Sequence, residues 1–180
     1  YDNAGNSISE TIEFFTDSKE PRISKTLPKK KSFSSGLFEV EFKEENPEEL
    51  ILHYGNDAEG MNSHSLNLIA DCSQDRGKYM CETNVDLSDY DSQKINYYFH
   101  LIDRAGQEDV SKSTEISVDT TFPIINSITY EMLSNSRANI LVNFTETNLD
   151  EVIYTIDSKE KRFCSKQPCE KKIKLSSGFN

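Results

Sequence analysis

Cysteine is the residue type in this chain with the most direct chemistry, and its four cysteines form two local pairs. Eight residues separate Cys72 from Cys81, and four separate Cys164 from Cys169. Zinc sites favour thiolates about two to four residues apart with a histidine nearby, whereas these spacings differ and no histidine lies close to Cys164. We therefore expect two disulfides, each closing a hairpin between neighbouring strands, with a zinc site or free thiols as the alternative. Disulfides would place the protein outside the cell or on its surface.

Oxygen-bearing side chains gather around two Asp-x-x-x-Pro segments, at residues 17–21 and 119–123. The segments around residues 44–46 and residue 103 are expected to be loops that lie at the end of the fold where the chain enters. Carboxylate and amide oxygens there would suit calcium. The expected ligands are Asp17, Glu20, Glu44, Asn46 and Asp103 at the first junction, and Asp119, Glu146 and Asn148 at the second. The alternative is that they are solvated turn residues, because Asp and Asn favour turns.

Catalytic patterns are missing from the sequence: it holds no G-x-S-x-G, P-loop or H-E-x-x-H motif. We expect no enzyme. The histidines His53, His64 and His100 fall in separate expected strands or strand edges, and His53 and His100 are interpreted as a surface pair rather than a ligand set. Asn143 begins an Asn-Phe-Thr acceptor pattern for N-glycosylation, although an outward strand residue explains it equally.

Charge and hydropathy limit the classes of partner that the chain is expected to bind. Its 180 residues carry 31 acidic and 20 basic side chains, a net charge of −11. Nucleic-acid binding needs clustered Lys and Arg, and docking on an anionic membrane needs the same, so neither is expected. No run of 18 apolar residues exists, so no segment is expected to cross a membrane. The acidic balance is compatible with cation binding and with solubility outside the cell.

Several segments of the sequence recur at a spacing of 101 or 102 residues. Residues 2–5 match 103–106, residues 17–23 match 119–125, residues 40–42 match 142–144, and residues 44, 46, 49 and 51 match 146, 148, 151 and 153. A period of about 100 residues is the size of an immunoglobulin-like domain. It excludes solenoid repeats of about 20–45 residues.

The repeat predicts the domain frame. Residues 1–16 would be the terminal strand of a preceding repeat, residues 17–119 a complete repeat, and residues 120–180 the N-terminal part of the following one. Two interpretations follow. The preferred one is a window cut from a longer chain. The alternative is that the tail of one subunit and the head of the next complete one sandwich by strand complementation.

Within the complete repeat, period-two alternation predicts seven short strands. They are expected at residues 22–27, 37–43, 49–54, 66–71, 79–87, 94–102 and 114–118. Residues 47–50 would form one helical turn at most, and Tyr97 or Tyr98 would make the tyrosine-corner bond of sandwiches. The side chains expected to face the core are Phe38, Val40, Phe42, Ile95, Tyr97, Phe99, Leu101, Ile116 and Val118. The expected fold is therefore all-β, with tandem immunoglobulin-like antiparallel β-sandwiches.

The turn and junction motifs suggest a family. Asp-x-Ala-Gly-Asn at residues 2–6, a strand, and Asp-Thr-Thr-x-Pro-x-Ile at residues 119–125 resemble the bacterial and archaeal immunoglobulin-like (Big or adhesin-type) tandem repeats of large cell-surface proteins. The resemblance covers the whole chain and implies a stalk or filament shaft, and some of those repeats hold calcium at their junctions. The chain departs from the pattern at Gln107, which replaces the Asn, and at Ser18-Lys19-Glu20, which replaces Thr-Thr-x.

These observations predict an extracellular structural or adhesive repeat module that forms a stalk, surface layer or filament shaft. Its partners would be neighbouring repeats or subunits of the same protein. The alternatives are a ligand-binding module that recognises a glycan or protein, or an accessory domain of a secreted hydrolase. Recognition surfaces are rich in exposed aromatic residues, and the candidate loops are mostly polar, with Tyr90 as the exception.

Overall fold

The computed structural model describes residues 4–5, 7–12 and 16–175. It divides into two compact units, Tyr1–Thr120 and Thr121–Asn180. The described residues form strands, turns and one short 3₁₀ helix at Ser88–Tyr90. No helix among them is long and apolar enough to span a membrane.

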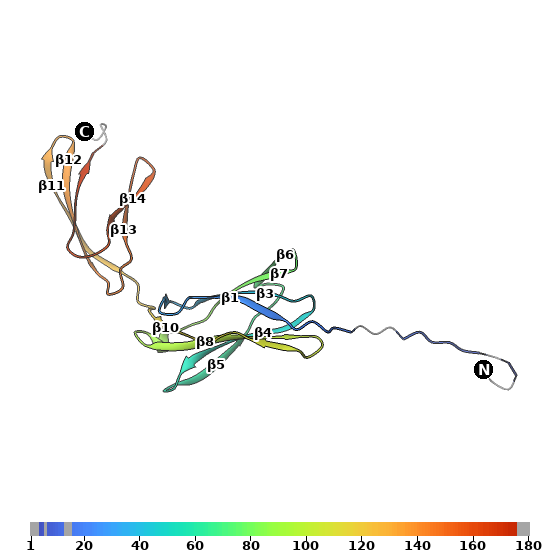
Figure 1. Cartoon of the computed structure of the whole chain (residues 1–180). Coiled ribbons are helices and arrows are strands. Elements are labelled where there is room, and N and C mark those ends of the chain that lie inside the picture. Colours follow the sequence, from blue (N-terminus) through green and yellow to red (C-terminus); the bar gives the residue numbers. More distant parts are fainter. Residues whose placement is uncertain (1–3, 6, 13–15, 176–180) are drawn as a thin grey trace. The chain divides into compact units, whose positions relative to one another are not determined.

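The first unit is a sandwich of two sheets (Figure 1). Its strands are β1 (Arg22–Leu27), β2 (Phe33–Ser34), β3 (Leu37–Lys43), β4 (Pro47–Asn56), β5 (Gly60–Ser65), β6 (Cys72–Asp75), β7 (Lys78–Asn84), β8 (Lys94–Asp103), β9 (Glu108–Val110) and β10 (Thr114–Val118). One sheet has the order β1-β3-β7-β6, and the other has the order β2-β10-β8-β4-β5 with β9 beside β8. This is the strand arrangement of an immunoglobulin-like domain, which confirms the expected fold.

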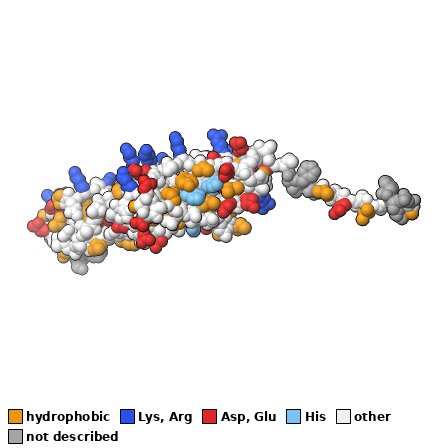
Figure 2. Space-filling view, turned by 90° about the horizontal axis from the view of Figure 1, so that it is seen from below, with side chains coloured by type: hydrophobic (Ala, Val, Ile, Leu, Met, Phe, Trp, Pro, Cys, Tyr) orange, Lys and Arg blue, Asp and Glu red, His pale blue; other side chains and the backbone are white. Residues whose placement is uncertain are grey.

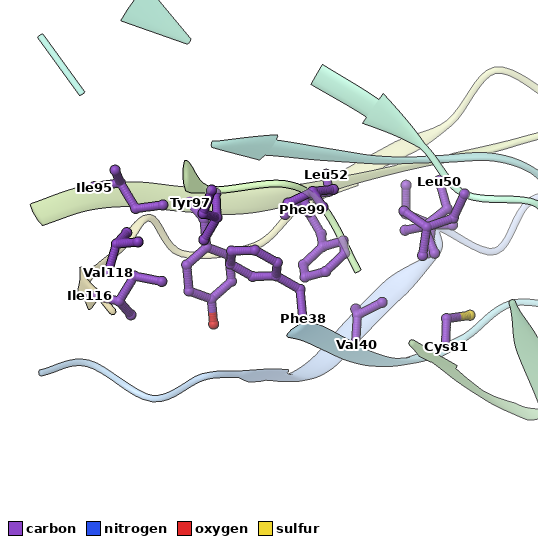
Figure 3. Packing of buried hydrophobic residues seen from close by; sticks show 14 of the residues in the cluster. Phe38, Val40, Leu50, Leu52, Cys81, Ile95, Tyr97, Phe99, Ile116 and Val118 are labelled. Carbon is purple, nitrogen blue, oxygen red and sulfur yellow. The ribbon is translucent and has the colours of Figure 1, made fainter. Parts of the chain in front are cut away.

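The core of the first unit forms where β3 and β8 face each other. Period-two alternation directs Phe38, Val40 and Phe42 inward from β3, and each is at most 1% exposed. From β8, Tyr97 and Phe99 point toward Phe38 and Val40 (Figure 3). The core residues expected from the sequence are all buried in the first unit.

Tyr97 connects the two sheets through its hydroxyl group. The hydroxyl donates a hydrogen bond of 2.5 Å to the carbonyl oxygen of Pro28, which follows β1 in the opposite sheet. A tyrosine corner would instead use a carbonyl a few residues upstream. The ring of Tyr98 stacks on His53 on the outer face. The bond of Tyr97 therefore differs from the expected corner, because it joins β8 to the connection between β1 and β2.

Two local expectations are wrong. Residues 66–71 are not a strand but a loop between β5 and β6. The side chain of Asn67 accepts hydrogen bonds from the backbone of Ile69 and Ala70, and Asp71 accepts one from the backbone of Asn67. These local bonds compete with pairing to another strand. Residues 47–50 belong to β4 rather than to a helical turn.

The second unit contains β11 (Ile124–Ser134), β12 (Arg137–Thr145), β13 (Val152–Ile156), β14 (Lys159–Cys164) and β15 (Cys169–Lys174). Its sheets have the orders β11-β12-β15 and β13-β14. The three-stranded sheet repeats the register of β1-β3-β7. Ile23 pairs with Phe42 as Ile125 pairs with Phe144, and both ladders shift register immediately after this pair.

The repeat extends to the third strand of each sheet. Val40 lies opposite Cys81, and its counterpart 102 residues later, Val142, lies opposite Cys169. In the same frame β13 and β14 correspond to β4 and β5. Among residues 121–175, no strand corresponds to β8, β9 or β10. Residues 4–5, 7–12 and 16 contain no strand either, so the expected terminal strand of a preceding repeat stays a prediction.

Candidate functional site

Three carboxylates meet at the end of the first unit where the chain enters. One oxygen from each of Asp17, Glu44 and Asp103 lies within 4.8 Å of the others. Asp103 is fully buried and Glu44 is 6% exposed, whereas Asp17 is half-buried. Carboxylates packed this closely repel each other unless donors or a cation offset their charge. The cluster is therefore the part of the described chain best suited to hold a cation.

Strand ends and tight turns position the two buried carboxylates. Glu44 directly follows β3, and its Oε1 accepts a hydrogen bond of 2.8 Å from the backbone N–H of Asn46. Asp103 ends β8, and its Oδ1 accepts bonds of 2.8 Å from the backbone N–H groups of Ala105 and Gln107. Each turn thus occupies one oxygen of the carboxylate and fixes the direction of the other.

Asp17 joins the cluster from the segment that precedes β1. Its Oδ2 accepts a bond of 2.9 Å from the side-chain amide of Asn46, and its Oδ1 accepts one of 3.1 Å from the backbone N–H of Lys19. These bonds stabilise the charged form, so the pKa of Asp17 lies below its ordinary value, first because of Asn46 and then because of Lys19. Asn46 therefore contacts the cluster as an amide donor.

Gln107 adds a feature that the sequence expectations did not include. Its side-chain amide nitrogen lies 3.3 Å from the backbone oxygens of Asp17 and Lys19 and 3.3 Å from Oδ2 of Asp103. The Gln107 amide thus joins two backbone carbonyls of the entering segment to the Asp103 carboxylate. Carboxylate and carbonyl oxygens are the kinds of ligand that calcium takes. The signal in the sequence is that Gln107 replaces the Asn of the repeated turn motif.

The other expected ligands do not all join this group. Glu20 is exposed and is not part of the cluster. At the second junction, Oε1 of Glu146 accepts a bond of 2.7 Å from the backbone N–H of Asn148, which repeats the Glu44–Asn46 turn. Asp119 belongs to the first unit, where its backbone N–H donates to the carbonyl of Ser34. A calcium site at the second junction stays a prediction.

Both expected disulfides are present, but they connect different structures. Cys72 and Cys81 are directly opposite in the β6–β7 hairpin, with their Cα atoms 4.0 Å apart. Cys164 ends β14 and Cys169 begins β15, which lie in separate sheets. The expectation that the second disulfide closes a hairpin is therefore wrong. This disulfide instead connects the two sheets of the second unit. A zinc site or free thiols are excluded, because every cysteine is bonded.

The histidine pair lies on the outer face of the first unit. The rings of His53 on β4 and His100 on β8 have centroids 6.3 Å apart, and His53 stacks on Tyr98 at 4.7 Å. Nε2 of His100 lies 2.6 Å from a carboxylate oxygen of Glu108 on β9. Figure 2 shows histidine side chains, in pale blue, beside hydrophobic ones on the face of the molecule in view. The contacts agree with a surface pair.

The glycosylation acceptor pattern lies on the outside of the second unit. Asn143 is exposed on β12, between the buried Val142 and Phe144. Its position in the ladder is opposite Ser127 of β11. Exposure is compatible with a glycan and also with an ordinary outward strand residue, so glycosylation of Asn143 stays a prediction.

The chain was compared with family models, with curated proteins and with solved structures. No family model and no curated protein matches the sequence. Among solved structures, the chain is similar to the crystal structure of the chicken CNTN1 FN1-FN3 domains, with a TM-score of 0.51 and 12% identity over 86% of this chain and 55% of that chain. This chain thus spans about half the length of the chicken structure.

Two further structures resemble the chain less closely. Fibronectin(III)-like modules of Clostridium thermocellum CbhA match with a TM-score of 0.42 and 12% identity, over 88% of this chain and 80% of that one. A tetra-tandem repeat from the extending region of a large adhesion protein matches with a TM-score of 0.36 and 13% identity, over 87% and 40%. The likeness that carries weight is the one to the chicken domains, and at 12% identity it concerns the β-sandwich fold alone.

Proposed function

We propose that this chain is part of an extracellular structural or adhesive shaft, built from repeats of one sandwich type, as in a stalk, surface layer or filament. The observation that carries this proposal is the internal repeat: Ile23–Phe42 and Ile125–Phe144 pair alike, as do Val40–Cys81 and Val142–Cys169. Modules in series hold a terminal function at a distance, and each module contacts mainly its neighbours. The adhesin-type repeats of bacterial and archaeal surface proteins are the proposed kind.

The partners in this proposal are neighbouring repeats or subunits of the same protein, joined in part by strand complementation. Disulfides in both units support an oxidising, extracellular location. The alternative of a ligand-binding module depended on Tyr90 as an exposed aromatic residue of the loops, and this residue is buried. Tyr90 is only 4% exposed, and its hydroxyl accepts a bond of 2.7 Å from Asn62 inside the first unit.

Labelling of intact cells tests the extracellular shaft. An antibody against residues 17–119 should label cells that produce the full protein without permeabilisation. Labelling only after permeabilisation would contradict the location.

A binding screen separates the shaft from a recognition module. The purified chain is tested against a panel of polysaccharides and surface proteins. Saturable binding that is blocked by substitutions in the loops would favour recognition.

We further propose that calcium binds at the first junction through Asp17, Glu44 and Asp103 and stiffens the entering segment. The convergence of these carboxylates beside the carbonyls of Asp17 and Lys19 supports this site. Calcium would offset the repulsion between the carboxylates and link the entering segment to the ends of β3 and β8.

Removal of calcium tests the site. The first unit should melt at a higher temperature in excess calcium than in EDTA, because a ligand bound only to the folded state stabilises by about 2.7 kcal/mol at a hundredfold excess over Kd. Asp17→Asn should abolish this difference, whereas Asp89→Asn, at an exposed residue of the 3₁₀ helix, should preserve it. Equal midpoints in calcium and EDTA for the parent chain would reject the site.

A further inference from the structure

The inner face of the second unit leaves large apolar side chains in contact with solvent. On β11, Ile125 and Ile128 are each 60% exposed, and Tyr130 is 72% exposed. Together with Ile140, Val152 and Phe163, the two isoleucines line an apolar pocket of about 310 Å³ between the two sheets of this unit. Exposed apolar surface of this kind marks an interaction site.

The first unit shows what covers the equivalent pocket. There Ile23, the counterpart of Ile125, is half-buried, and Leu50 and Leu52, the counterparts of Val152 and Tyr154, are fully buried, because β8 inserts its side chains between the sheets. Tyr97 packs on Phe38 with ring centroids 4.9 Å apart, and Phe99 belongs to the same core. Burial of such apolar side chains is the main favourable contribution to the docking of a strand.

The repeat transfers the register of β8 to the second unit. In the first unit Leu50, Leu52 and Tyr54 lie opposite Leu101, Phe99 and Tyr97. The residues 102 positions after those of β4 are Val152, Tyr154 and Ile156, which alternate along β13. Among the described strands, β13 pairs with β14 alone, so its other edge has backbone groups available for a further strand.

We infer that the second unit binds an antiparallel strand of the β8 type along β13, with large apolar side chains opposite Val152, Tyr154 and Ile156. The strand is supplied by a repeat of the same protein. This inference rests on the proposed strand complementation and specifies its chemistry. Backbone bonds to β13 supply pairing, and the pocket selects aromatic or branched side chains at alternate positions.

The head of a second copy is a poor candidate for this strand. In the repeat frame, residues 7–16 correspond to 109–118, which contain part of β9 and all of β10. In the first unit β9 pairs with β8, and β10 pairs with β8 and β2, but neither pairs with β4. Residues 7–16 of a second copy would therefore have no strand to pair with until a β8-type strand lay beside β13. Ile8 and Ile12, at 96% and 80% exposed, suit a strand that pairs with that β8-type strand.

An extended chain tests the inference. Residue Leu175 corresponds to Leu87, because Cys169 corresponds to Cys81. The test protein is residues 1–175 followed by a second copy of residues 88–119. The amides of β13 should gain about tenfold or more protection from hydrogen exchange, and binding of the dye ANS, which reports exposed apolar surface, should fall about threefold or more. The matched control carries Tyr97→Ser, Phe99→Ser and Leu101→Ser in the appended copy only, and should show neither change.

The outcomes separate this inference from the broader proposal. If the appended copy folds without protecting β13, or if the control protects β13 equally, the inference is wrong while the shaft remains testable by cell labelling. If the extended chain is insoluble, a synthetic peptide of residues 93–103 added to the parent replaces it, and absence of protection then also overturns the inference. If the parent chain is a dimer, and if deletion of residues 1–16 converts it to a monomer and raises ANS binding, the inference is wrong. Residues 1–16 of a second copy then cover the apolar face of the second unit instead.

Discussion

At the scale of single residues, His53 shows how the sandwich alters the chemistry of a side chain. The ring is half-buried on the outer face, stacked on Tyr98 and close to His100. Burial lowers the pKa of His53 below its ordinary value, and the charge of His100 lowers it further. The unfolded chain therefore binds a proton at this residue more readily than the folded chain does.

This shift predicts a pH dependence of stability. Because the folded pKa is depressed, the contribution of His53 to the free energy of unfolding is present above its unfolded pKa of about 6.5 and is lost as the pH falls below it. His53→Phe, which retains a ring to stack on Tyr98, should lose less stability between pH 8 and pH 5 than the parent in urea unfolding. His64→Gln should behave as the parent. An identical loss in His53→Phe and the parent would count against the assignment.

At the scale of elements, β6 depends on its disulfide more than on packing. It is an edge strand of four residues whose described neighbour is β7, and Ser73, Gln74 and Asp75 are exposed. Cys81 in contrast is 3% exposed and belongs to the core. The bond between Cys72 and Cys81 thus fixes a polar strand at the edge of a buried one.

Replacing Cys72 and Cys81 together with Ala should lower the free energy of unfolding of the first unit by about 2–3 kcal/mol, the entropy of the closed loop in the unfolded chain. Urea unfolding followed by circular dichroism measures the loss. The matched pair, Cys164→Ala with Cys169→Ala, should leave the transition of the first unit unchanged and destabilise the second. A reducing agent should reproduce both effects, and a double variant as stable as the parent would show that pairing of β6 and β7 suffices.

At the scale of the whole molecule, the two units have the same strand plan but different degrees of completion. In the first unit the side chains of β8 fill the interior between the two sheets. The second has a core of five buried residues, Val142, Phe144, Phe163, Cys169 and Ile173. Domain stability rises with the apolar area removed from water, so the units should differ in stability.

The intact chain is therefore expected to unfold in two steps, with the second unit unfolding at the lower urea concentration. Leu52→Ala, in the core of the first unit, should shift only the later step, by about 2–5 kcal/mol. Phe144→Leu, in the core of the second, should shift only the earlier step. A single transition that both substitutions move together would show that the units unfold as one.

Much of this architecture was determined by the sequence itself. Alternation of apolar residues is local, so β1, β3 and β10 were predicted with their observed bounds. The 102-residue repeat predicted the shared sheet. The convergence of Asp17, Glu44 and Asp103 followed from the order of strands, because adjacent loops of a sandwich meet at one end. The paired cysteines predicted the disulfides.

The tertiary structure decided what depends on contacts between distant segments. It placed Gln107 against the carbonyls of Asp17 and Lys19, and left Glu20 outside the cluster. It assigned the bond of Cys164 to two sheets rather than one hairpin. A strand sequence records which face is apolar but not which neighbour covers that face. For this reason, the repeat predicted a partial second sandwich, whereas the comparison of β13 with β4 located the edge along which a β8-type strand would pair.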